Sequence, residues 1–132
     1  MPEINYVSEI SDTEDILSRL SPPVRNWFKD TFDDFTDPQK VAIPKILSGE
    51  HLLLCSPTGS GKTLTAFLSI IDELVRKSMD GTLEDTIYCV YISPIKALAN
   101  DIQKNLIAPL TEIKERFLPG RAQDIKVGLR TG

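Results

Sequence analysis

One short glycine-containing segment constrains the fold of this sequence more than any other feature. It covers residues 56–63 and reads Ser-Pro-Thr-Gly-Ser-Gly-Lys-Thr, directly after the apolar run 52–55. That run is too short for a helix and is bounded by turn residues, so it predicts a buried strand of a parallel sheet. Residues 62–77 carry apolar side chains three and four positions apart, which predicts an amphipathic helix. A strand, a glycine loop and a helix in this order are typical of a phosphate-binding loop.

The residue types in this loop suit a triphosphate. Gly59 and Gly61 let successive backbone amides turn inward around phosphate oxygens, next to the unpaired N–H groups of the following helix. Lys62 is the predicted catalytic residue because its charge meets the outer phosphates, and the hydroxyl of Thr63 is the predicted ligand of Mg²⁺. The predicted ATP-binding residues of the loop are Ser56, Pro57, Thr58, Gly59, Ser60, Gly61, Lys62 and Thr63.

The loop departs from the general pattern G-x-x-x-x-G-K-[ST] at its first position, where Ser56 replaces glycine. A glycine-rich turn without a ligand is the alternative interpretation. Phosphate binding is favoured, because Gly-Lys-Thr at the head of a helix after an apolar strand rarely arises by accident.

The rest of the chain predicts an α/β fold. Helices are expected at 12–20, from Ser21-Pro22 onward, at 37–49 with a break or kink at Pro44, at 95–107, and from Pro109 onward. Strands are expected at 52–55, 86–92 and 125–129. Strands alternating with helices imply a parallel sheet with helical crossovers. The two cysteines, Cys55 and Cys89, are expected to be buried free thiols.

The charge balance weakly disfavours a nucleic-acid partner. There are 19 acidic and 15 basic residues, a formal charge of -4, so any polyanion must meet a local basic patch. No apolar run approaches the roughly 18 residues of a membrane span, and the amino terminus does not resemble a signal peptide. We therefore expect a soluble cytoplasmic protein with no membrane partner.

The neighbours of the loop resemble those of superfamily 2 helicases. The segment 35–40, Phe-Thr-Asp-Pro-Gln-Lys, looks like their Q-motif region, with Gln39 in the place of the adenine-reading glutamine. The loop 56–63 is similar to their motif I, which explains why Ser56 need not be glycine. The amino-acid sequence of residues 20–132 looks most like that of the large helicase-related (Lhr) group.

Two further segments resemble nucleic-acid-binding motifs of the same superfamily. Residues 91–101 resemble motif Ia, and residues 128–132 resemble the next strand-end motif. Both motifs contact a nucleic-acid backbone in the family. The resemblance therefore implies contacts from Ser93, Pro94, Lys96, Arg130, Thr131 and Gly132. Strand-end amides and the Lys96 charge suit a phosphate, but a solvated strand-to-helix turn stays open as the alternative.

The resemblance also divides the chain. Residues 1–36 would be helices leading into the Q-motif-like region, and residues 37–132 the amino-terminal part of a RecA-like ATP-binding domain. No carboxylate pair suited to ATP hydrolysis follows a strand, and the acidic pair Asp72-Glu73 is expected to face solvent in mid-helix. The carboxylate motif and a second motor domain would then follow Gly132. We expect this piece alone to be inactive, and to be poorly soluble or only partly ordered because apolar strand edges are exposed. The rest of the motor polypeptide is its expected partner.

The leading hypothesis is thus part of an ATP-dependent helicase or translocase acting on DNA or RNA. Two alternatives stay open at this stage. One is a P-loop enzyme of another class, such as a kinase or transport ATPase, because these share the loop. The other is a nucleotide-binding module without catalysis.

Overall fold

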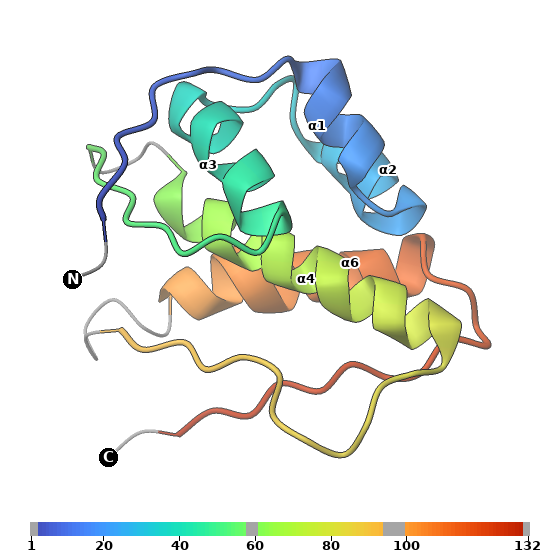
Figure 1. Ribbon diagram of the computed structural model, residues 1–132. Coiled ribbons are helices and arrows are strands. Elements are labelled where there is room, and N and C mark those ends of the chain that lie inside the picture. Colours follow the sequence, from blue (N-terminus) through green and yellow to red (C-terminus); the bar gives the residue numbers. More distant parts are fainter. Residues whose placement is uncertain (1–2, 58–60, 94–99, 131–132) are drawn as a thin grey trace.

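One long helix organises the molecule. The structure is a computed structural model that describes residues 3–57, 61–93 and 100–130. Helix α4 (Lys62–Asp80) runs through its centre, and helices α2 (Pro22–Thr31) and α3 (Asp37–Leu47) pack against it (Figure 1). Helix α1 (Thr13–Arg19) covers α3, while η1 (Gln103–Ile107) and α6 (Ala108–Arg116) pack on α4 and α2 from the other side.

The helix predicted at 62–77 is confirmed and extends to Asp80. Its apolar stripe forms the centre of the core, where Leu68, Ile71 and Val75 are completely buried. Gly81 ends the helix in the left-handed conformation with φ 72°. The periodicity was sufficient to predict this helix because a long stripe has to be covered by other elements.

Pro44, where a break or kink is expected from the sequence, does not break α3. The helix continues through Pro44 to Leu47. A proline in a helix removes the N–H that would bond to the carbonyl four residues earlier, here that of Lys40. The Lys40 carbonyl instead accepts a hydrogen bond from the backbone N–H of Ser11 at 3.3 Å. The amino-terminal segment therefore supplies the donor that Pro44 lacks.

The helix predicted to begin at Pro109 is also different in the structure. Residues 100–116 form one continuous helical stretch, in which η1 is a turn of π-helix directly before α6. The N–H of Ala108 bonds to the carbonyl of Gln103, five residues back. This wider turn lets the helix continue through a proline.

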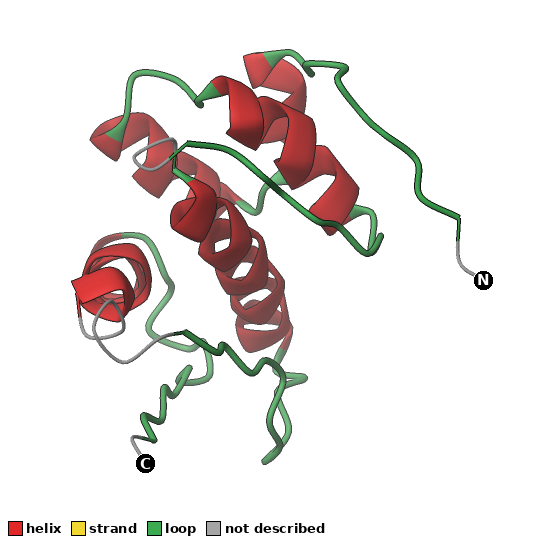
Figure 2. Cartoon of the chain, turned by 90° about the vertical axis from the view of Figure 1, so that its left-hand side faces the viewer, coloured by secondary structure: helices red, strands yellow, loops and turns green. Residues whose placement is uncertain are grey.

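The three predicted strands are not formed in the described part of the chain. Segments 52–55, 86–92 and 125–129 are loops there (Figure 2). A strand requires a neighbour that pairs with its backbone groups, and these segments do not pair with one another. Most of their apolar side chains stay exposed, as expected for unpaired edges, with Leu53 and Ile92 both 88% exposed, whereas Ile125 is buried at 4%.

The prediction that the two cysteines are buried is wrong for the same reason. Cys55 and Cys89 are free thiols, as expected, but both are exposed. Each lies in a loop segment that was predicted to be a strand. Burial of these thiols requires neighbouring strands that the described residues do not provide.

The three extended segments nevertheless share a direction, and two of them contact the helices. They run in the same direction, toward the side of the molecule where α4 begins (Figure 1). The ring of Tyr91 packs on that of Phe67 in α4, with centroids 4.7 Å apart. Lys114 of α6 donates to the carbonyl of Ile125 at 2.6 Å. Segments 86–92 and 125–129 lie below α4 and α6 in Figure 1, whereas segment 52–55 runs nearer to α3.

Asp72 is buried, which corrects the expectation that it faces solvent. Its side chain is 2% exposed, whereas the neighbouring Glu73 is exposed as expected. The Asp72 carboxylate accepts hydrogen bonds from the backbone N–H of Ser21 at 2.6 Å and from Nε of Arg76 at 3.0 Å. Arg76 also donates to the carbonyl of Arg19. The helix face was misjudged because the segment joining α1 to α2 covers it.

A membrane-spanning helix is not found among the described residues, since none of their helices combines the necessary length and apolar character.

Candidate nucleotide-binding site

The phosphate-binding loop predicted at 56–63 leads directly into α4. Ser56 and Lys62, near its two ends, are in contact, because Nζ of Lys62 donates to the Ser56 carbonyl at 2.6 Å. Lys62 is an exposed side chain at the first position of the helix, and Thr63 is partly buried at the second. Pro57 is exposed, while Thr58, Gly59 and Ser60 lie outside the described residues. The chain therefore turns back on itself so that an ammonium group lies beside the start of the loop.

The amino-terminal end of α4 offers a partial positive charge at the same place. Its first residue is preceded by Gly61, and no side chain among the described residues caps it. The first backbone N–H groups of a helix have no partner within it, and they point in the direction of the positive end of the helix dipole. These groups and the Lys62 ammonium together form a region suited to an anion.

Two features, its backbone conformation and the nearby Gln39 side chain, favour glycine at position 61. Its φ of +82° lies in the left-handed region, and an added Cβ would approach Nε2 of Gln39 to 2.5 Å. Its carbonyl accepts from the Thr65 N–H at 3.0 Å, the Thr65 hydroxyl at 2.7 Å and Nε2 of Gln39 at 3.3 Å. Gly61 thus joins the loop, the first turn of α4 and α3.

We expect Gly61→Ala to weaken nucleotide binding about tenfold, because an L-residue at this φ is strained by about 1–2 kcal/mol and the loop backbone beside the phosphates would shift to relieve that strain. The added methyl group also displaces Gln39. Gly49→Ala is a matched control: it has a similar φ of +80°, but a Cβ there meets nothing within 4 Å. The control should lower thermal stability and leave the nucleotide dissociation constant unchanged. Equal affinities for both variants would show that the contact between Gly61 and Gln39 does not matter for binding.

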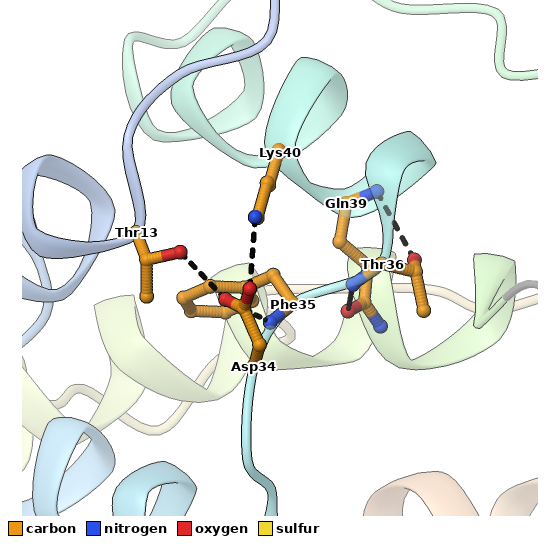
Figure 3. Close-up of polar contacts among 6 residues, drawn as sticks. All are labelled: Thr13, Asp34, Phe35, Thr36, Gln39 and Lys40. Atoms are coloured by element: carbon orange, nitrogen blue, oxygen red, sulfur yellow. Dashed lines mark hydrogen bonds and ion pairs between the residues drawn. The ribbon is translucent and has the colours of Figure 1, made fainter.

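Gln39 lies at the start of α3 with its side-chain amide held at both ends, and Figure 3 shows the contacts with Thr36. It is 4% exposed, and its Oε1 accepts from the Thr36 N–H at 2.9 Å. The Thr36 hydroxyl accepts from the Gln39 N–H at 3.4 Å, which completes a reciprocal capping box. With Nε2 donating to Gly61, the orientation of the amide is fixed, because only oxygen can accept and only nitrogen can donate.

A carboxylate lies just before this capping box. Asp34 accepts from the Thr13 hydroxyl at 2.5 Å, from the Phe35 N–H at 2.7 Å and from Nζ of Lys40 at 2.9 Å (Figure 3). The hydrogen bond from Thr13, followed by that from Lys40, lowers the pKa of Asp34 to about 2. Asp34 is therefore ionised at neutral pH. Neither Asp34 nor Thr36 was among the predicted site residues, although the pattern Thr-x-x-Gln at 36–39 is a recognisable capping signal.

Of the predicted nucleic-acid contacts, the structure describes Ser93 and Arg130. Ser93 is partly buried and Arg130 is exposed, each in a segment that ends on the side where α4 begins (Figure 1). Pro94, Lys96, Thr131 and Gly132 lie outside the described residues. Among the described residues there is no group of three or more His, Cys, Asp or Glu side chains that could hold a metal ion.

Comparison with known proteins gives a consistent set of relatives. Residues 36–126 match the family model described as DEAD/DEAH box helicase. The chain is similar to the ATP-dependent helicase Lhr-Core of Methanothermobacter thermautotrophicus, with 56% identity over 89% of this chain and 14% of that protein. The Lhr-Core of Methanocaldococcus jannaschii is 45% identical over 99% of this chain and 16% of its own length. The Lhr helicase/uracil glycosylase of Escherichia coli is 43% identical over 86% of this chain and 8% of its own length.

The chain thus spans less than a fifth of the length of these curated relatives. No solved structure matches it.

Proposed function

This chain belongs to the DEAD/DEAH box helicase family, and from that premise we propose that it is the ATP-binding segment of an Lhr-type helicase. The intact protein would couple ATP hydrolysis to movement along DNA or RNA in the cytoplasm. The observation that carries this proposal is the hydrogen bond from Nε2 of Gln39 to the Gly61 carbonyl, which brings the Q-motif-like segment against the phosphate loop.

In this proposal, Gln39 reads the adenine base. Two hydrogen bonds fix the direction of its amide, and one Nε2 hydrogen and one Oε1 lone pair remain that the described residues do not use. A neighbouring donor and acceptor suit adenine, which presents an amino group next to a ring nitrogen. Guanine presents a carbonyl beside the same ring nitrogen, so the fixed amide distinguishes the two bases.

The phosphates and the metal ion are assigned to the loop that follows. Residues 56–63 would surround the triphosphate with backbone amides, Lys62 would balance the charge of the transferred phosphate, and the Thr63 hydroxyl would hold Mg²⁺. Catalysis also requires groups that activate water, and we place these in the rest of the motor polypeptide. We therefore expect hydrolysis only from the intact protein.

Family membership implies a RecA-like fold for the region. We propose that segments 52–55, 86–92 and 125–129 are strands of its parallel sheet, with residues 37–132 as the first part of the ATP-binding domain and residues 1–36 as the helices before it. Their common direction and their exposed apolar side chains, such as Leu53 and Ile87, support this assignment. Further strands of the intact protein would pair with them and bury these side chains.

Nucleic acid is the proposed partner, through Ser93, Pro94, Lys96, Arg130, Thr131 and Gly132. Backbone contacts release counterions, so log affinity should fall linearly with log salt, with a slope of about 0.7 to 0.9 per phosphate neutralised. In the intact protein, Lys96→Ala should flatten that slope by about one unit. Lys29→Ala, at an exposed lysine of α2, is the control and should leave the slope unchanged. An unaltered slope for Lys96→Ala removes this residue from the site, and ATP hydrolysis that no nucleic acid stimulates contradicts the helicase proposal itself.

A further inference from the structure

We propose that Asp34 is a positioning residue of the nucleotide site, which braces the first turn of α3 and so holds Gln39 in place against the phosphate loop (Figure 3). This inference rests on the proposed role of Gln39 as the residue that contacts the base. Asp34 touches neither nucleotide nor loop, and its contact with Thr13 gives α1 a role in holding the site.

The three donors to Asp34 come from different parts of the chain. Thr13 is the first residue of α1, Phe35 is the next residue in the backbone, and Lys40 lies in α3 directly after Gln39. One carboxylate therefore connects α1 with the residues before and after the start of α3. Because Asp34 stays ionised at neutral pH, all three bonds are charge-assisted.

The residues between Asp34 and Gln39 are themselves fixed. The ring of Phe35 is buried and stacks on that of Phe28, with centroids 3.9 Å apart and planes at 13°. Thr36 exchanges two hydrogen bonds with Gln39 in the capping box. A change in the position of Asp34 is thus transmitted through ordered residues to the amide of Gln39.

A second contact from the amino-terminal segment supports the same turn. The N–H of Ser11 bonds to the Lys40 carbonyl, two residues before Thr13 meets Asp34. The outer side of the first turn of α3 is therefore held by residues 11–13, while Nε2 of Gln39 on the inner side reaches the carbonyl of Gly61. The turn lies between the amino-terminal helix and the phosphate loop.

Replacing Asp34 should weaken recognition of the base more than it lowers the stability of the protein. The Asp34 side chain is 49% exposed, and exposed ion pairs contribute little to the free energy of unfolding. A recognition group, by contrast, has to be held within a fraction of an ångström of its productive position. This difference separates a positioning role from a purely structural one.

The test measures dissociation constants for ATP and GTP in the intact protein by calorimetry. We expect Asp34→Asn to weaken ATP binding about 3- to 10-fold and to change GTP binding less than about twofold, so that the preference for adenine falls. Asp33→Asn, which removes the same charge at the exposed neighbouring position, is the matched control and should change neither constant. Thr13→Val and Lys40→Met remove a donor each and should reproduce part of the loss.

A double-mutant cycle with Gln39→Ala identifies the route of the effect. If Asp34 acts through Gln39, Asp34→Asn should cause no further loss of ATP affinity in the Gln39→Ala background. Additive losses, or an unchanged ATP to GTP ratio in Asp34→Asn while the wild type prefers ATP, overturn the positioning role and leave the proposed function standing. A wild type without any preference for ATP contradicts the proposed role of Gln39, and the role of Asp34 with it.

Discussion

Asp72→Ala is expected to lower the free energy of unfolding by about 2–3 kcal/mol. The carboxylate is 2% exposed and accepts from the backbone N–H of Ser21 at 2.6 Å. Ser21 precedes the first turn of α2, and its own side chain does not cap that helix. Asp72 in α4 therefore provides the negative charge at the positive end of α2, which a capping side chain would otherwise supply.

Most of this loss comes from the backbone group. Alanine leaves the Ser21 N–H buried without its acceptor, which costs about 1–3 kcal/mol. The loss of the favourable charge at the start of α2 adds about 0.3–1 kcal/mol. The ion pair with Arg76 contributes less, since the Arg76 side chain is 48% exposed and regains water when its partner is removed.

The prediction is checked by thermal unfolding of the intact protein, together with hydrogen exchange of the α2 amides. Asp72→Ala should lower the midpoint of the transition that includes this region and increase exchange in α2. Glu73→Ala, at the exposed neighbouring position, should do neither. Equal stability of the two variants would mean that the buried carboxylate contributes nothing to the attachment of α2.

The helices could be predicted wherever a local pattern determines them. The apolar stripe of α4 and the starts at Ser21-Pro22 and Asp37-Pro38 are local signals, and each produced the expected helix. The outcome at Pro44 could not be predicted in this way. It depends on Ser11, which donates to the Lys40 carbonyl from a distant part of the sequence.

The absence of the strands and the burial of Asp72 could not be predicted from local sequence either, because both depend on distant parts of the chain. An apolar run becomes a strand only when another strand pairs with it, and segment 86–92 has no such partner in the described chain. Cys89 is therefore exposed there. Asp72 was assigned to the solvent face because helical spacing cannot reveal that the backbone before α2 crosses it.

In the candidate site, too, features set by consecutive residues were predictable and features set by distant residues were not. Gly61, Lys62 and Thr63 were predicted from a motif whose residues are consecutive, and the structure describes them at the start of α4. The contact of Gln39 with the Gly61 carbonyl requires α3 to pack on α4, which no spacing in the sequence specifies. The role of Asp34 depends on α1 and is visible only in three dimensions.

Lys62→Ala is expected to weaken ligand binding more than Gly61→Ala or Asp34→Asn. The ammonium group lies beside the Ser56 carbonyl at one end of the loop and is exposed, so it is available to a phosphate. A hydrogen bond that involves a charged group is worth about 1.5–3 kcal/mol, and one ammonium can donate to more than one phosphate oxygen. We expect ATP affinity to fall by about 100-fold or more.

The helix itself should not change, because alanine is a good helix former and the Lys62 side chain is not part of the core. Lys77→Ala is the matched control, since it removes the same charge from the last turn of the same helix. It should leave ATP affinity unchanged. Circular dichroism should show the same helix content in both variants and the wild type.

The most direct measurement is a calorimetric titration of the intact protein with ATP in magnesium buffer, carried out in parallel on the wild type, Lys62→Ala and Lys77→Ala. The phosphate-loop assignment predicts heat of binding for the wild type and Lys77→Ala, and none within the measurable range for Lys62→Ala. An affinity of Lys62→Ala equal to that of the wild type would contradict it.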